Sequence, residues 1–249
     1  MGTRIMEAII LAGGQGTRMQ KIEHKIPKVM LEINDRPFLY WIIKQLQANK
    51  VNKIILCLGI KHEQITKSFD KYNFENIEIS YFIEDQQLGT GGALIKVLNL
   101  IKNNNFIFMN GDSIFNIPIQ KLFKEHTKNQ NDLTYSIKKL QLQNTEYGGI
   151  SIKKNGEIVS HKMGANSKNK LIDAGLRVIS KKAIDKIIKQ SQNKYPISFE
   201  NDIAPELIKN HKVRGLVYDF DFFDIGNPES YKYTKTNFAK IKNQMYCYE

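Results

Sequence analysis

The sequence predicts an α/β protein whose central sheet is mixed but mostly parallel. In the first half of the 249-residue chain, short apolar runs alternate with helical segments, as in parallel strands joined by right-handed crossovers. The runs at residues 8–11 and 52–59 show no alternation of apolar and polar residues, which indicates strands buried on both faces. The second half mixes strands and helices, so the sheet should not be purely parallel.

Each expected element follows from these patterns, taken along the chain. We expect strands at residues 8–11, 52–59, 77–85, 105–112, 132–140, 147–163 and 173–180. We expect helices at residues 37–50, 63–69, 89–101, 181–190 and 201–209, and a terminal helix after Pro228. No repeat, low-complexity tract or linker divides the chain, so we expect a single domain over residues 1–249, with residues 1–5 as an extension outside its core.

Composition and charge narrow the classes of function. The formal net charge is +12, but the lysines are scattered and no aromatic–basic ladder or groove-reading motif accompanies them. We therefore expect anionic small substrates and no nucleic acid. The two cysteines form no disulfide framework or metal-ligand spacing, and we read Cys57 as a core thiol and Cys247 as a tail thiol. With no signal peptide and no apolar run of about 20 residues, we expect a cytoplasmic protein without a membrane partner.

The first glycine-rich segment, "EAIILAGGQGTRM", directly follows the first buried strand. Glycines let backbone amides approach an anion closely, and Arg18 supplies a fixed positive charge. The segment lacks the Lys-Ser/Thr pair of a Walker loop, and Met19 stands where the dinucleotide fingerprint needs its last glycine. A tight turn is the ordinary alternative, but such a turn rarely needs three glycines. The pattern favours a phosphate loop of another kind.

Three charged residues elsewhere suit the same chemistry. Lys28 follows Pro27, whose fixed backbone should hold the lysine in place; taken alone, Lys28 is equally well an ordinary surface lysine. Asp112 and Asp224 each follow an apolar run, where the ligand crevice of an open sheet lies. Each aspartate alone is also a common turn or N-cap residue. Together, two carboxylates suit Mg²⁺ bridging phosphates.

A second glycine-rich segment, "EDQQLGTGGAL", also lies between a strand and a helix. Such a loop can press its backbone against a flat base, while the N-terminus of the helix favours negative charge. Glu84 precedes it, and a carboxylate accepts the paired donors of a guanine edge, whereas a glutamine suits uracil or thymine better. A surface glutamate at a strand end is the alternative.

The landmarks together resemble the nucleotide-sugar pyrophosphorylases, or sugar-1-phosphate nucleotidylyltransferases. The resemblance spans nearly the whole chain and rests on "LAGGQGTRM…PK", "LGTGGAL", "NGDS", "YGG", "DAG" and "DIGNPESY" in the order of the family. It implies a Rossmann-like, GT-A-like nucleotidyltransferase fold. It also implies the reaction of a nucleoside triphosphate with a sugar 1-phosphate to give a nucleotide sugar and pyrophosphate, without a covalent enzyme intermediate.

The resemblance further implies a role for each matching residue. Arg18 and Lys28 would be catalytic, stabilising charge on the transferring and leaving phosphates, and Asp112 and Asp224 would hold Mg²⁺. The nucleotide would contact Leu11, Gly13, Gly14, Gly16, Thr17, Glu84, Gly89 and Thr90. The sugar phosphate would contact Gly148, Lys162, Asp173 and Gly175.

Departures from the family pattern bear on the substrate. Ser160 stands where many members carry a glutamate, and Asp173 stands where many carry an asparagine. With Glu84, the short length and "FFDIGNPESY", the chain looks most like the guanylyltransferases that use GTP and D-glycero-α-D-manno-heptose 1-phosphate in making surface polysaccharide.

Several alternatives remain open. One is a mannose-1-phosphate guanylyltransferase, another is a short uridylyltransferase for a cell-wall amino sugar, and a third is a cytidylyltransferase for alditol phosphates. An inactive regulator that binds nucleotide sugars belongs to another class. The sequence also leaves open a homo-oligomer.

Overall fold

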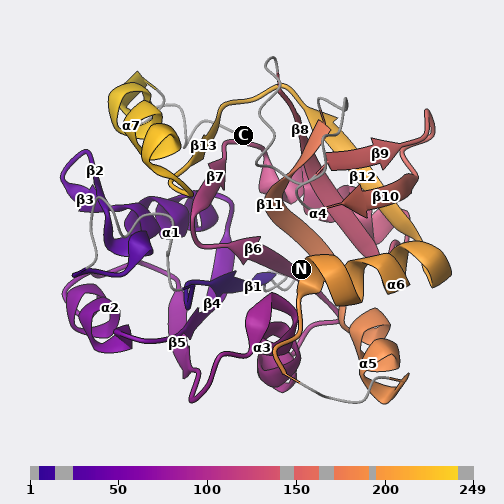
Figure 1. Cartoon of the computed structure of the whole chain (residues 1–249), viewed down its shortest axis with the longest axis horizontal. Coiled ribbons are helices and arrows are strands. Elements are labelled where there is room, and N and C mark those ends of the chain that lie inside the picture. The colour runs from indigo at the N-terminus through magenta and orange to yellow at the C-terminus, as the bar shows by residue number, and fades with distance from the viewer. Residues whose placement is uncertain (1–5, 15–24, 141–148, 163–170, 191–194, 241–249) are drawn as a thin grey trace. The chain divides into compact units, whose positions relative to one another are not determined.

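The structure is a computed structural model that describes residues 6–14, 25–140, 149–162, 171–190 and 195–240. The chain divides into two compact units. Unit 1 comprises Met1–Gln86, Met109–Ile119 and Asp221–Glu249, and unit 2 comprises Gln87–Phe108 and Gln120–Phe220. Each unit combines strands with helices (Figure 1), which confirms the predicted α/β fold with a mixed, mostly parallel central sheet. The single domain over residues 1–249 stays a prediction.

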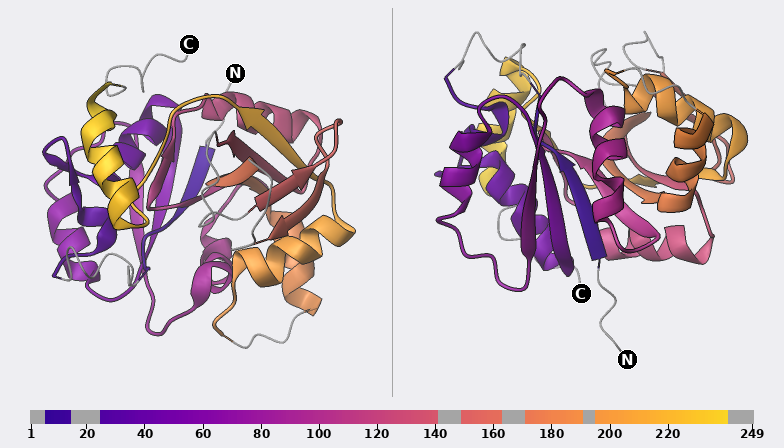
Figure 2. Two further views of the ribbon diagram at one scale, coloured as in Figure 1. Left: turned by 45° about the horizontal axis from the view of Figure 1, so that its top comes forward. Right: turned by 90° about the horizontal axis from the view of Figure 1, so that it is seen from below.

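Three parallel strands organise unit 1. β1 (Met6–Leu11) pairs with β4 (Val51–Leu58), and β4 pairs with β5 (Glu78–Ile83). Figure 2 shows the three strands side by side. β1 is buried along nearly its whole length, as its unbroken apolar run predicts. Because the strands are parallel, their carboxyl ends reach the same edge, where Leu11 stands opposite Cys57 and Leu58 opposite Ile83.

The helices of unit 1 follow the expected segments. α1 (Phe38–Ala48) buries an apolar face around Trp41, whose indole N–H donates to the Ile33 carbonyl over 2.8 Å. α7 (Pro228–Asn237) begins with Asn227 and Ser230 capping each other's backbone N–H groups. The remaining small elements are the 3₁₀ turn Lys28–Met30, β2 (Glu32–Ile33), β3 (Arg36–Pro37), α2 (His62–Phe69) and the 3₁₀ turn Phe238–Lys240.

A short antiparallel ladder in unit 1 joins two segments far apart in the sequence. β7 (Ser113–Phe115) pairs with β13 (Phe222–Asp224), so that Ser113 stands opposite Asp224. Just before β7, the Gly111 N–H donates to the Leu11 carbonyl over 2.8 Å. This bond fastens the "NGDS" segment to the end of β1.

Unit 2 is built around a mixed set of strands. β8 (Leu133–Lys139) pairs antiparallel with β11 (Leu171–Ser180) and parallel with β12 (Val213–Tyr218), while β9 (Gly149–Ile152) and β10 (Ile158–Lys162) form a hairpin. The other elements that lie wholly or mainly in unit 2 are α3 (Gly89–Val97), a 3₁₀ turn (Leu98–Leu100), β6 (Asn105–Asn110), α4 (Ile119–Lys128), α5 (Lys181–Gln190), a π-helical turn (Phe199–Ile203) and α6 (Ala204–Asn210).

Several details differ from the expectation. The strand expected at residues 147–163 is two strands, β9 and β10. Gly156, with a φ of +87°, lies in the turn between them. The sequence patterns did not predict β12.

Cys57 is fully buried, as expected, whereas Cys247 lies outside the described residues. None of the helices in the described ranges has both the length and the apolarity needed to cross a membrane.

Gly111→Ala should lower the free energy of unfolding by about 1–3 kcal/mol, because a Cβ at this position would lie 2.6 Å from the Leu11 carbonyl oxygen. Chemical denaturation followed by circular dichroism measures the change. The matched control is Gly14→Ala, where no described atom lies within 4 Å of the added carbon and the change should stay within about 0.5 kcal/mol. Equal stability of the two variants would contradict the contact between Gly111 and β1.

Candidate active site

The first glycine-rich segment starts at the carboxyl edge of the parallel strands in unit 1. Leu11 ends β1, and Ala12 still donates to the Cys57 carbonyl over 2.9 Å. Gly13 then passes so close to Gly59 that a Cβ on Gly59 would lie 2.6 Å from the Gly13 carbonyl oxygen. Both glycines are thus required by a backbone approach at the edge of the sheet. Gly16, Thr17 and Arg18 lie outside the described residues.

Glu84 lies beside this segment. Its backbone N–H donates to the Leu58 carbonyl over 2.8 Å, which continues the pairing just past β5. Its carboxylate reaches Gly13, because a Cβ built on that glycine would be 3.0 Å from Glu84 Oε1. Burial, and then the charge of Glu84, raise the pKa of the Cys57 thiol far above its usual value. The structure therefore brings the predicted base-binding carboxylate and the predicted phosphate loop together.

Lys28 forms an ion pair with Asp112. Pro27, with φ −58°, starts a 3₁₀ turn in which the Leu31 N–H donates to the Lys28 carbonyl over 3.0 Å. The Lys28 side chain is 16% exposed, and its Nζ lies 2.5 Å from Asp112 Oδ2. The ion pair with Asp112 thus links the Lys28 side chain to the segment before β7, and the role predicted for Lys28 stays a prediction.

The two aspartates predicted to hold a metal lie on the short ladder of unit 1. Asp224 ends β13 opposite Ser113, and the next N–H, that of Ile225, donates to the Asp112 carbonyl over 3.0 Å. Asp224 is buried, and its Oδ1 accepts the Gly226 N–H over 2.8 Å. The β7–β13 pairing is therefore what brings Asp112 and Asp224 to neighbouring positions.

The donor set at this place fits Mg²⁺. The ion prefers hard oxygen ligands and is usually held by one or two protein carboxylates together with substrate phosphates and waters. Within the described residues there is no group of three or more His, Cys, Asp and Glu side chains arranged to hold a metal. The predicted magnesium site at Asp112 and Asp224 stays a prediction.

The second glycine-rich segment, in unit 2, packs against residues 195–199. The Gly91 and Gly92 N–H groups donate to the Ile197 carbonyl over 2.8 and 3.1 Å, and the Ile197 N–H donates back to the Leu88 carbonyl over 2.8 Å. Gly89 has a φ of +77°, and a Cβ on it would lie 2.4 Å from the Ile197 oxygen. Two N–H groups of the first turn of α3, those of Gly91 and Gly92, thus donate to a protein carbonyl.

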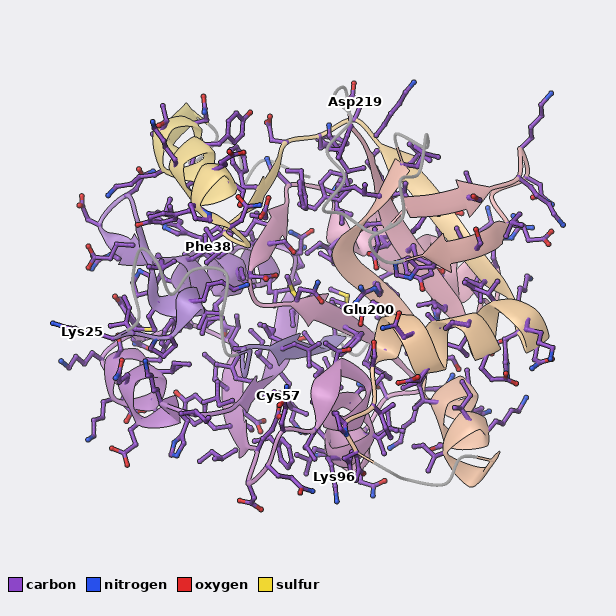
Figure 3. All side chains as sticks on the ribbon, in the orientation of Figure 1. Lys25, Phe38, Cys57, Lys96, Glu200 and Asp219 are labelled. Carbon is purple, nitrogen blue, oxygen red and sulfur yellow. The ribbon has the colours of Figure 1, made fainter. Side chains whose placement is uncertain are left out.

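Thr90 is hydrogen-bonded within unit 2 on both sides of its hydroxyl. The hydroxyl donates to Glu200 Oε2 over 2.8 Å and accepts the Phe199 N–H over 2.7 Å. Glu200 lies near the start of the helical segment that continues into α6 (Figure 3). The predicted contact of Gly89 and Thr90 with a nucleotide stays a prediction.

Asp173 pairs with Arg177 rather than standing alone in a pocket. Its Oδ1 accepts the Gly175 N–H over 2.9 Å, and its Oδ2 accepts Arg177 Nε over 2.7 Å and also Nη2. Glycine is favoured at position 175, because its φ of +75° lies in the left-handed region that residues with side chains rarely adopt. Lys162 ends β10, and Gly148 lies outside the described residues. The roles predicted for these residues toward a sugar phosphate stay predictions.

Arg177 itself was missed by the sequence analysis. It is 2% exposed, and Arg177 Nη2 also lies 3.2 Å from Glu200 Oε1. Burial alone would lower the pKa of Arg177, but Asp173 and Glu200 raise it above its usual value. An arginine inside the apolar run "LRVIS" was the available signal, because a charged residue on a buried strand requires charged partners.

His161 completes this cluster. Its Nδ1 lies 3.3 Å from the Tyr135 hydroxyl, and its Nε2 lies 3.8 Å from Asp173 Oδ2. Burial lowers the pKa of His161 although the nearby Asp173 opposes that shift. The side chain is therefore neutral near pH 7.

A comparison with protein families decides the class. The sequence matches the family described as nucleotidyl transferase over residues 7–240. The chain belongs to the nucleotidyl transferase family. This confirms the predicted family and the prediction that the chain is an enzyme that transfers nucleotidyl groups to sugar 1-phosphates.

Individual relatives of this nucleotidyl transferase also carry the names of nucleotidyltransferases. It is 34% identical over 227 residues to the D-glycero-alpha-D-manno-heptose 1-phosphate guanylyltransferase of Aneurinibacillus thermoaerophilus, covering 91% of this chain and 96% of that protein. The enzyme of the same name from Campylobacter jejuni is 34% identical over 226 residues, with 91% and 97% covered. The crystal structure of HddC from Yersinia pseudotuberculosis complexed with GMP-PN superposes with a TM-score of 0.79 at 31% identity, covering 94% of this chain and all of that one.

Arg177→Met should lower the free energy of unfolding of this nucleotidyl transferase by about 3–5 kcal/mol, because Asp173 and Glu200 would stay buried without their cation. Thermal and urea denaturation measure the loss. The control is Arg36→Met, which removes an exposed guanidinium lying 5.7 Å from the ring of Tyr40 and should cost at most about 1 kcal/mol. Wild-type stability of Arg177→Met would contradict a charge-dependent cluster.

Proposed function

We propose that this nucleotidyl transferase is a guanylyltransferase that transfers GMP from GTP to D-glycero-α-D-manno-heptose 1-phosphate. The observation that supports it most is the grouping of Lys28, Asp112 and Asp224 in unit 1, where Glu84 also lies beside Gly13. The relatives that are 34% identical over nine-tenths of the chain carry this activity in their names, which supports the choice of base and sugar.

The chemistry is a single displacement at phosphorus. A phosphate oxygen of the sugar 1-phosphate attacks the α-phosphorus of GTP, a new P–O bond forms, and the bond from the α-phosphorus to the bridging oxygen breaks. Pyrophosphate leaves with the electron pair of that bond, and GDP-heptose remains. The protein therefore needs to position two phosphorylated substrates and to stabilise charge, rather than to supply a nucleophile.

Named residues of unit 1 perform these tasks. Asp112 and Asp224 would hold Mg²⁺, which would supply positive charge to the phosphates. Lys28, held within 2.5 Å of Asp112, neutralises charge on the leaving pyrophosphate, and Arg18 is assigned the same task from its place in the sequence motif. Leu11, Gly13, Gly14, Gly16 and Thr17 offer backbone and hydroxyl donors to the nucleotide.

Base and sugar are assigned to further residues. The Glu84 carboxylate accepts from guanine N1–H and the exocyclic amine, an arrangement that a uracil or thymine cannot reproduce. Gly89 and Thr90 are assigned to the nucleotide from the sequence motif that they share with the family. Gly148, Lys162, Asp173 and Gly175 contact the sugar phosphate. The product would serve surface polysaccharide synthesis, in the cytoplasm, and a homo-oligomer is compatible with this role.

Purified protein should release pyrophosphate with GTP, Mg²⁺ and D-glycero-α-D-manno-heptose 1-phosphate. A coupled pyrophosphate assay run with each nucleoside triphosphate against heptose, mannose and N-acetylglucosamine 1-phosphates measures the preference. Because carboxylates hold the ion, EDTA should abolish turnover and excess Mg²⁺ should restore it. Turnover with UTP or dTTP alone would sink the assignment of guanine, and a preference for mannose 1-phosphate would replace heptose.

Asp112→Asn should reduce turnover by several orders of magnitude while leaving the fold intact. The substitution removes the charge that Mg²⁺ and Lys28 share, at a side chain that is one-third exposed and carries little of the stability. Steady-state kinetics and circular dichroism test the two halves of this expectation. Asp221→Asn, at an exposed position just before β13, is the matched control and should keep full activity. Retained turnover in Asp112→Asn would remove Asp112 from the metal site.

A further inference from the structure

A continuous chain of polar contacts runs through unit 2 from Thr90 to Asp173. The Thr90 hydroxyl donates to Glu200 Oε2 over 2.8 Å, and Glu200 Oε1 lies 3.2 Å from Arg177 Nη2. Arg177 Nε in turn donates to Asp173 Oδ2 over 2.7 Å. Successive contacts thus link β11, which carries both Asp173 and Arg177, to Glu200 and to Thr90, which lie elsewhere in the sequence. We call Thr90, Glu200, Arg177 and Asp173 the Arg177 network.

The network is buried and its charges are tightly packed. The side chains of Arg177, Asp173 and Glu200 are 2%, 5% and 10% exposed. The guanidinium also lies 4.8 Å from the ring centroid of Phe199 and 5.6 Å from that of Phe108. In such surroundings each charge needs its partners in place, so the network allows few alternative arrangements.

Each carboxylate also holds a piece of backbone through a second contact. Asp173 accepts the Gly175 N–H, which fixes the left-handed turn on β11. Glu200 accepts the Thr90 hydroxyl, and that hydroxyl accepts the Phe199 N–H, which closes the segment around Gly89 onto residues 198–200. Arg177 is the cation that both carboxylates share. A change at Thr90 therefore acts on Glu200, which binds Arg177, and a change at Asp173 acts on Arg177 itself.

We propose that Glu200 and Arg177 are positioning residues that hold the nucleotide-binding segment at Gly89–Thr90 and the sugar-binding segment at Asp173–Gly175 in one fixed arrangement. The inference rests on the proposed function, which assigns these two segments to the two substrates. Glu200 and Arg177 act through Thr90 and Asp173 and need not touch either substrate. Weakening the network should therefore impair binding of both substrates, whichever end is changed.

The test uses substitutions that keep hydrogen-bond capacity and one counter-charge. Glu200→Gln still accepts from Thr90 and leaves Arg177 paired with Asp173, and Asp173→Asn still accepts from Gly175 and leaves Arg177 paired with Glu200. Thr90→Val keeps the volume and removes the hydroxyl. The matched controls are Glu206→Gln on α6 and Thr127→Val, whose hydroxyl donates to the Phe123 carbonyl. Circular dichroism and thermal unfolding establish that every variant is folded.

Steady-state kinetics with both substrates varied should show that Glu200→Gln and Asp173→Asn each raise KM for GTP and for the sugar phosphate by about ten- to a hundredfold. The double variant Thr90→Val/Glu200→Gln should be no worse than the more affected single variant, since one removes the Thr90–Glu200 hydrogen bond and the other the Glu200–Arg177 ion pair of the same chain of contacts. Both controls should match the wild type.

Other outcomes overturn the inference and identify why. If Thr90→Val changed only KM for GTP and Asp173→Asn only KM for the sugar phosphate, the two ends would act independently. If the folded variants lost thermal stability but kept both KM values, the network would serve stability alone. Additive effects in the double variant would likewise exclude action through one shared network. A wild-type protein inactive with GTP and every sugar phosphate would instead fail the proposed function, and the inference with it.

Discussion

The parallel pairing of β1 with β4, and of β4 with β5, is the constraint on which the candidate site of unit 1 depends. It brings the three carboxyl ends to one edge, so that Ala12, Gly59 and Glu84 start from neighbouring positions. The Gly111 N–H then joins the segment before β7 to the end of β1. Because Gly13 follows the end of β1 and Glu84 follows the end of β5, a shift in strand register would separate Glu84 from Gly13.

Much of this arrangement could be predicted from the sequence, because it follows from local patterns. Unbroken apolar runs identify β1 and β4, and charged or glycine residues directly after strands identify the edge that holds the site. The partners of Arg177 could not be predicted, since Asp173 lies on the same strand but Glu200 comes from another element. Nor does any local pattern pair Lys28 with Asp112, which lies 84 residues away. Such choices depend on tertiary packing.

The glycines of the two loops show why a motif alone is an incomplete guide. Both segments are glycine-rich, and both follow the end of a strand. Gly13 is required at the sheet edge by the nearness of Gly59, whereas Gly89 makes room for the backbone at Ile197 and Gly91 for the side chains of Ile197 and Ile203. The sequence pattern predicted that both segments bind a ligand. In α3 the glycines contact other parts of the protein. A glycine-rich segment therefore indicates a close approach of the backbone, and it does not by itself indicate a bound ligand.

The Lys28–Asp112 ion pair has a consequence for how the free protein handles dissolved ions. A lysine without an acidic partner attracts a small anion from solution, and that anion must be released when a polyanionic substrate binds. Lys28 carries its counter-ion on the polypeptide, at a position that is mostly shielded from solvent. Arrival of a phosphate and a divalent cation together then becomes a double exchange of partners, in which no dissolved anion has to leave the lysine. The free protein is in this sense already charge-compensated where a highly charged substrate would bind.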